Sequence, residues 1–239
     1  MRFYRNEQIE VLARDRLADL EQAIGHSIIP PVPIDLLAEK VLRLDFLWEI
    51  IEELPGEMIL GAIVPKKRLI VLNEARRDLF LKKPGLERST KGHEMGHWDL
   101  FVDKATLDHP RLFQNDDDGP FALRSSGVGE VAVLSILEAS FEGQELLRKM
   151  RQRADEPDEA RAVNRYAAAI SMPNRLLCRE AEKIDRTQWR CLYDLARKFQ
   201  VTISALRVRL EQMDLLYVTP DGKLFESRDA AQGQMGFSF

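Results

Sequence analysis

Residues 93–97 of the chain read His-Glu-Met-Gly-His, and two of the protein's four histidines lie in this pentapeptide. Residues four apart share one face of a helix, so His93 and His97 can present ring nitrogens to a single point. Two imidazoles arranged in this way bind Zn²⁺ at Zn–N distances of about 2.0–2.1 Å. Glu94 is adjacent and can take a proton from a water molecule that the metal activates. The pentapeptide therefore predicts a hydrolytic zinc site; the alternative is a buried helix whose histidines are only hydrogen-bonded.

The residues around this motif indicate how it is positioned. Helix-start residues open the stretch 84–92, and apolar residues for packing follow the motif. Upstream, three runs have the composition of strands, and the last two are spaced as a hairpin: Leu44–Ile50, Met58–Val64 and Leu69–Leu72. We therefore expect a small antiparallel sheet that leads into the motif helix. An edge of such a sheet can pair with an extended peptide beside the zinc site.

Helical periodicity marks further elements on either side. Residues 6–24 form an amphipathic pattern that ends at Gly25, and a short helix is expected at 34–41. Asp155-Glu-Pro-Asp-Glu159 combines a capping aspartate, early acids and an early proline, which predicts a helix that runs to Ser171. One face of this helix is small and apolar and suits close packing on another helix: Ala160, Val163, Ala167 and Ile170.

The stretch between these helices gives weaker signals. Residues 115–120 predict a turn but no calcium loop, because the twelfth position of the template is Ser125 and not glutamate. Residues 127–132 match a dinucleotide fingerprint only superficially, since no βαβ unit surrounds them. We interpret them as a glycine-bearing turn, followed by a helix at 136–153.

The C-terminal part has helix-turn-helix spacing, with helices expected over Trp189–Phe199 and Thr202–Met213. Arg207, Arg209 and Gln212 could face a DNA groove. The formal net charge of −4 and the pI of about 5.7 favour instead a helical element that packs on the rest of the chain. A hairpin that turns at Asp221-Gly222 is expected next.

Length and composition bound the organisation. With 239 residues, 45 % hydrophobic and 31 % charged, the chain is expected to form a domain over 1–185, a helix-turn-helix-like element with a hairpin over 186–225 and a flexible tail over 226–239. No apolar leader or membrane-spanning stretch is visible. Cys178 and Cys191 make no disulfide framework. A cytoplasmic protein without a membrane partner is the expectation.

Three segments occur in an order that is familiar: Arg88–Trp98 around the motif, Asn164–Pro173, and Leu195–Leu210. In this layout the chain resembles the ImmA/IrrE family of zinc metallopeptidases over roughly residues 28 to 218. The resemblance implies a gluzincin-like α+β fold with an HExxH zinc site. It also implies a hydrolase: an endopeptidase that cleaves a protein substrate, a repressor of the phage or stress-response type such as a helix-turn-helix repressor.

The resemblance assigns His93 and His97 as zinc ligands and Glu94 as general base. In the family, a glutamate six residues before the aromatic residue of the "FAA" segment is the third ligand. That aromatic is Tyr166 here, and Ala160 stands six residues before it. Glu159, one residue earlier, is the predicted third ligand, although one residue is about 100° of helix rotation. The other candidates are Glu156, His109, Glu138 and Glu142.

Several alternatives stay open at this point. Glu156 and Glu159 could merely complement the helix dipole. Tyr166 and His109 are candidate donors to the oxyanion, and Asp99 is a candidate acceptor for a ligand imidazole. The shifted glutamate motivates a second reading, a zinc-binding sensor or partner-binding module without hydrolysis. A third reading is a DNA-binding regulator that acts through residues 189–213.

Overall fold

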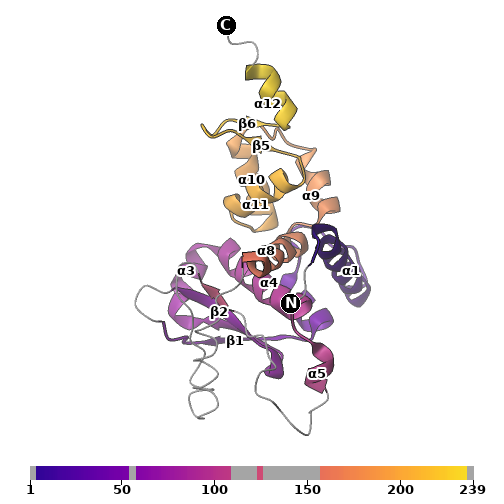
Figure 1. Cartoon of the computed structure of the whole chain (residues 1–239), viewed down its shortest axis with the longest axis vertical. Coiled ribbons are helices and arrows are strands. Elements are labelled where there is room, and N and C mark those ends of the chain that lie inside the picture. Colours follow the sequence, from indigo (N-terminus) through magenta and orange to yellow (C-terminus); the bar gives the residue numbers. More distant parts are fainter. Residues whose placement is uncertain (1–3, 54–57, 109–122, 126–156, 236–239) are drawn as a thin grey trace.

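The computed structural model describes residues 4–53, 58–108, 123–125 and 157–235. Over these residues the protein has a mixed α+β fold, mostly helical with a small sheet. In Figure 1 the sheet lies in a body together with α1, α3, α4 and α8, and the C-terminal helices α9 to α12 extend from one end of that body. The turn expected at 115–120, the glycine-bearing turn and the helix at 136–153 lie outside the described residues.

The sheet has four strands in the order β1-β3-β2-β4, with bounds Asp45–Glu49, Ile59–Val64, Leu69–Asn73 and Leu123–Ser125 for β1 to β4. The predicted hairpin is confirmed: β2 pairs antiparallel with β3 through the 3-10 turn η2 (Pro65–Lys67). The prediction of a wholly antiparallel sheet is wrong, because β1 pairs parallel with β3. β3 lies between β1 and β2 in the sheet and runs in the same direction as β1. Only the pairings of β2, with β3 and with β4, are antiparallel.

The N-terminal helix α1 (Asn6–Ile24) ends as predicted at Gly25, whose φ of 75° is a left-handed conformation that glycine adopts without strain. Its inner face is buried and α1 packs on α8: Ile9, Ala13, Leu17 and Leu20. The short helix expected at 34–41 is present as α2 (Ile34–Leu36), which continues into a π-helical turn, η1 (Leu37–Leu42). α2 and η1 contact α4, which carries the motif, and α1 contacts α8.

The motif lies on α4 (Pro84–Leu100), which follows η3 (Glu74–Arg76) and α3 (Arg77–Lys82) and precedes α5 (Lys104–Asp108). Every residue from Thr90 to Trp98 is buried. The helix approaches the sheet closely, since a Cβ atom on Gly61 of β2 would lie 2.9 Å from Thr90 Cγ2. The motif is therefore a part of the protein core.

Helix α8 (Pro157–Ser171) packs along α4, and its predicted small face is the contact. A Cβ atom on Gly92 would lie 3.2 Å from Ala167 Cβ, and one on Gly96 would lie 3.0 Å from Val163 Cγ1. Two glycines one turn apart thus allow the backbones to approach. Figure 1 shows α8 beside α4 at the centre of the molecule.

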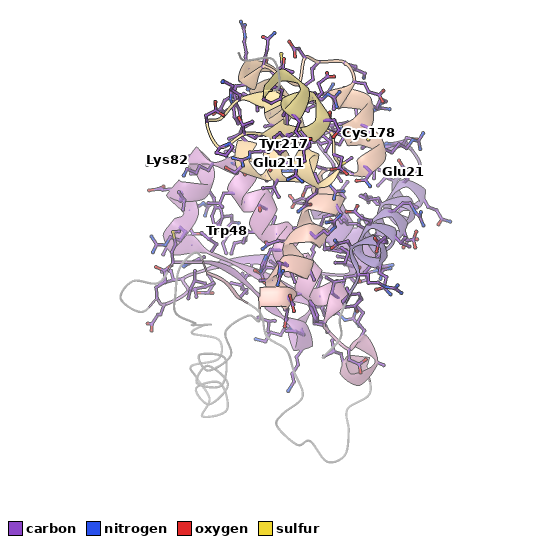
Figure 2. The ribbon with its side chains drawn as sticks, turned by 45° about the horizontal axis from the view of Figure 1, so that its top comes forward. Glu21, Trp48, Lys82, Cys178, Glu211 and Tyr217 are labelled. Atoms are coloured by element: carbon purple, nitrogen blue, oxygen red, sulfur yellow. The ribbon has the colours of Figure 1, made fainter. Side chains whose placement is uncertain are left out.

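The C-terminal part contains the two predicted helices and the hairpin. Its elements are α9 (Asn174–Ala181), α10 (Trp189–Phe199), α11 (Ile203–Gln212), β5 (Tyr217–Val218), β6 (Leu224–Phe225) and α12 (Arg228–Met235). Within the region 226–239, where a flexible tail is expected, the residues of α12 are helical. There, Ser227 Oγ accepts from Ala230 N, and the buried Ala231 anchors the helix. Figure 2 shows Glu211 and Tyr217 in this part, and Trp48 and Lys82 in the body.

A fully buried guanidinium fixes α11 to the rest of the chain. Arg209 donates to both carboxylate oxygens of Glu10 on α1, at 2.5 and 2.8 Å. It also donates to Asn174 Oδ1 at 2.6 Å and to the carbonyl oxygen of Met172 at 3.2 Å.

Within the described ranges, no helix is both long and apolar enough to cross a membrane.

Candidate metal centre

The two histidines of the motif converge as the spacing predicts. His93 Nε2 and His97 Nε2 are 3.0 Å apart, and the ring centroids are 4.7 Å apart. The rings are only 4 % and 2 % exposed. Two ligands of a tetrahedral zinc ion, each about 2.0–2.1 Å from the metal, lie about 3.3–3.4 Å from one another. The spacing of the two nitrogens is thus close to that of two ligands of one ion.

Glu94 lies between these histidines in the sequence and is fully buried. Both of its carboxylate oxygens are shielded from solvent. Because α4 packs on the sheet and on α8, this acid sits in the core of the molecule. The structure thus holds the Glu94 side chain out of bulk water, on the helix turn that carries the two histidines.

The structure also brings Glu159 to the histidines. Its Oε1 lies 3.4 Å from His97 Nδ1, and its side chain is 21 % exposed. The carboxylate therefore meets His97 at the nitrogen that does not face His93. In the described parts of the chain, no three His, Cys, Asp or Glu side chains are grouped in a way that could hold a metal ion. Glu156, His109, Glu138 and Glu142 lie outside the described residues.

Asn164 contacts the other histidine, a role that the sequence did not indicate. Its Oδ1 lies 3.1 Å from His93 Nδ1. Asn164 and Glu159 both belong to α8, so this one helix reaches the Nδ1 atoms of both rings. The sequence feature that bears on this contact is the small apolar face of α8, because it predicts that α8 packs closely on a neighbouring helix.

Tyr166 and Asp99 form a separate buried network, and the expectation that Tyr166 stabilises an oxyanion is wrong. The Tyr166 hydroxyl donates to Asp99 Oδ2 at 3.0 Å, which commits it to that carboxylate. Burial and the negative charge of Asp99 raise the pKa of Tyr166 well above its usual value. The other candidate donor, His109, lies outside the described residues.

Asp99 does not hold a ligand imidazole in place. Instead it accepts two hydrogen bonds from Arg16, at 2.8 and 2.9 Å, and one from Lys104 at 2.6 Å. Burial opposes ionisation of Asp99, but the hydrogen bond from Arg16 and the charge of Lys104 outweigh it, so its pKa is lowered. This network of ion pairs and hydrogen bonds links α1, α4 and α8.

The C-terminal helices are docked in a way that removes part of the predicted DNA surface. Arg209 is buried against Glu10, so its placement in a DNA groove is wrong, whereas Arg207 and Gln212 are exposed. The turn before α11 lies on α4, because a Cβ atom on Gly85 would be 2.7 Å from the carbonyl carbon of Val201. A helix-turn-helix reads DNA through the N-terminal residues of its second helix. Here the residues immediately before that end of α11, Val201 and Thr202, lie against Gly85 of α4.

Comparisons with known proteins give little further information. No family model matches the chain, and no curated protein matches it. Among solved structures it is similar to a Mycobacterium tuberculosis transcriptional regulator, with 14 % sequence identity and a TM-score of 0.42 over 92 % of this chain. The chain spans 59 % of that protein's length. A likeness at this level carries no argument about function.

Proposed function

We propose that this protein is a zinc-dependent endopeptidase that hydrolyses a peptide bond in a protein substrate. The observation that carries the proposal is the convergence of His93 Nε2 and His97 Nε2, 3.0 Å apart, on the buried helix turn that also carries Glu94. A carboxylate, Glu159, lies on a second helix 3.4 Å from Nδ1 of His97, and a turn of its side chain toward Nε2 would make it the third ligand. Two imidazoles and a carboxylate are a ligand set that catalytic zinc uses.

The hydrogen bonding of the rings supports a cation at this point. A neutral imidazole carries one proton, and an amide oxygen at Nδ1 of His93 places it on that nitrogen. The lone pair of His93 Nε2 then faces His97 Nε2. A metal ion bound by both nitrogens is stabilised by this arrangement, since ligand imidazoles use the lone pair of one nitrogen and donate from the other.

Each residue of the site has a chemical role in the proposal. His93 and His97 would hold the ion, with Glu159 as the third ligand. Zinc, when bound, supplies a Lewis acid for the peptide carbonyl and activates a water molecule. Glu94 accepts the proton of the attacking water and passes it to the leaving amine. The buried stretch from Thr90 to Trp98 keeps bulk water away from this transfer.

The substrate class comes from the motif resemblance. The three segments that resemble the ImmA/IrrE family extend the proposal to cleavage of a transcriptional repressor of the phage or stress-response type. The docked α10 and α11 are consistent with a helical packing element on the peptidase body, because Arg209 and Gly85 join them to α1 and α4.

The test compares the wild-type protein with a Glu94→Gln variant. We expect stoichiometric zinc in both after gentle purification, measured by mass spectrometry, and loss of cleavage in the variant when both are incubated with purified helix-turn-helix repressors. Glutamine keeps the shape of the side chain but cannot accept the proton. Cleavage by the variant at the wild-type rate, or a wild-type protein free of zinc, would contradict the proposal.

A second candidate is a zinc-binding regulator that does not hydrolyse its partner. The observation that favours it is the position of Glu159, which meets Nδ1 of His97 while Ala160 stands at the family's ligand position. A site with only the two histidine ligands would bind zinc more weakly than a site with a third, carboxylate ligand. Stoichiometric zinc without cleavage, together with unchanged zinc binding in a Glu159→Ala variant, would favour this candidate over the peptidase.

A further inference from the structure

We infer that Asn164 is a positioning residue that holds the His93 ring for metal binding. The inference rests on the proposed zinc site and adds a residue to it. Asn164 accepts a hydrogen bond from His93 Nδ1 at 3.1 Å, and the other nitrogen of that ring lies 3.0 Å from His97 Nε2. Because each nitrogen of the His93 ring has its own partner, the two contacts together fix both the tautomer and the orientation of that ring.

The backbone that carries Asn164 is itself held firmly. The preceding residue, Val163, is fully buried and packs against Gly96 of α4. Two residues further on, the buried Tyr166 is hydrogen-bonded to Asp99, which pairs with Arg16 of α1. The Asn164 amide therefore projects from a fixed point on α8 toward a fixed point on α4.

The exposure of Asn164 separates positioning from packing. Its side chain is exposed, unlike its neighbours Val163 and Tyr166, so its removal leaves no cavity in the core. An exposed position on a helix tolerates most side chains with a change in stability of about 0.5 kcal/mol or less. What a change at Asn164 removes is the acceptor for His93.

The expected size of the effect follows from similar sites. Loss of the partner that orients a ligand histidine costs 10–100-fold in metal affinity. Asn164→Leu removes the acceptor and keeps a similar side-chain size. Asn164→Asp keeps an oxygen at the same place and is expected to bind zinc within about threefold of the wild type, because a carboxylate serves equally as the acceptor.

The experiment measures zinc affinity by competition with a chromophoric chelator, and the visible absorption of the Co²⁺-loaded protein. The variants are Asn164→Leu, Asn164→Asp and the control Arg161→Ala, whose side chain is 76 % exposed on the same helix. We expect about 10–100-fold weaker zinc binding and an altered Co²⁺ spectrum only for Asn164→Leu. The metal-free unfolding temperatures of all four proteins should agree.

Other results would overturn the inference. Zinc binding by Asn164→Leu at wild-type affinity removes Asn164 from the site while leaving the proposed function intact. Equal losses in Asn164→Leu and Asn164→Asp, with a lowered unfolding temperature, assign a structural role instead. A wild-type protein that binds neither zinc nor Co²⁺ rejects the proposed function and this inference together.

Discussion

Gly96 of α4 lies against Val163 of α8, so closely that a Cβ atom on Gly96 would be 3.0 Å from Val163 Cγ1 and 3.2 Å from its carbonyl oxygen. Gly96 is also the residue before His97. The same glycine that lets α8 approach is therefore part of the pentapeptide that brings the histidines together. The approach of the two helices delivers Asn164 and Glu159 to the rings.

We expect Gly96→Ala to weaken both stability and zinc binding. Alanine is favoured over glycine in a helix by about 1 kcal/mol, but its methyl group meets a stiff valine and a backbone oxygen at this contact. α8 must move outward, which separates its side chains from the histidines. Urea unfolding and zinc affinity measure the two effects.

The matched control is Gly233→Ala on α12. A Cβ atom there meets nothing within 4 Å, so only the helix preference of alanine applies. This variant should be unchanged or more stable, by up to about 1 kcal/mol. A Gly96→Ala protein that gains as much stability and keeps its zinc affinity would show that the helix contact is not needed for the site.

Glu159 variants test whether this carboxylate is a ligand. We expect Glu159→Ala and Glu159→Gln both to weaken zinc binding by more than about 100-fold, because neither side chain supplies the anionic oxygen of a third ligand. Equilibrium dialysis against buffered zinc provides the measurement. Near-normal binding by the glutamine variant alone would instead assign Glu159 to the support of His97 Nδ1, where the structure places it.

The sequence predicted the elements of the site better than their arrangement. The i, i+4 spacing of His93 and His97 is local, so one helix turn suffices to make the two rings converge. The pairing of β1 is not local, and nothing in the alternation of apolar residues shows whether it joins β3 or β2. The hairpin of β2 and β3 was predictable because only four residues, 65–68, connect its strands.

Contacts between distant segments explain the remaining differences. Arg209 has the sequence context of an exposed helix residue, and only the approach of Glu10, far away in the chain, makes its burial favourable. Asn164 gained its contact to His93 in the same way, from the packing of α8 on α4. Tyr166 is a candidate oxyanion donor by residue type alone, and only the folded structure shows that its hydroxyl reaches Asp99.

The pair of Arg209 and Glu10 predicts how firmly α11 is attached. Arg209→Met removes the buried partner of Glu10 and leaves that carboxylate only the ion pair with Arg165 at 3.3 Å. The loss should therefore be at or below about 3–5 kcal/mol, the cost typical of a broken buried pair. We expect a marked loss of stability in thermal unfolding. The control is Arg207→Met, which removes only the ion pair with Glu211, 3.3 Å long, on an exposed face and should cost less than about 1 kcal/mol. Equal effects of the two changes would contradict the docking of α11.

The carboxylate of Glu180 on α9 is paired with basic side chains from α9, α10 and the turn after α9. Glu180 is buried and is paired with Lys183 at 2.8 Å, Lys198 at 2.5 Å and Arg179 at 3.2 Å. The hydrogen bonds from Lys183 and Lys198 lower its pKa from 4.5 to about 2. The charged form is therefore favoured by folding, and the lysine ends remain half exposed to water and salt.

This shift predicts a specific loss of stability in acid. Because the pKa of Glu180 is lower in the folded protein, its contribution is complete above pH 4.5 and disappears as the pH falls from 4.5 toward 2. We expect Glu180→Gln to lower the free energy of unfolding at pH 7 by about 1 kcal/mol, since exposed partners are screened. The difference from the wild type should shrink across that acid range in urea titrations and vanish near pH 2. A difference that stays constant from pH 7 to pH 2 would show that packing, and not the charge of Glu180, joins α9 to α10.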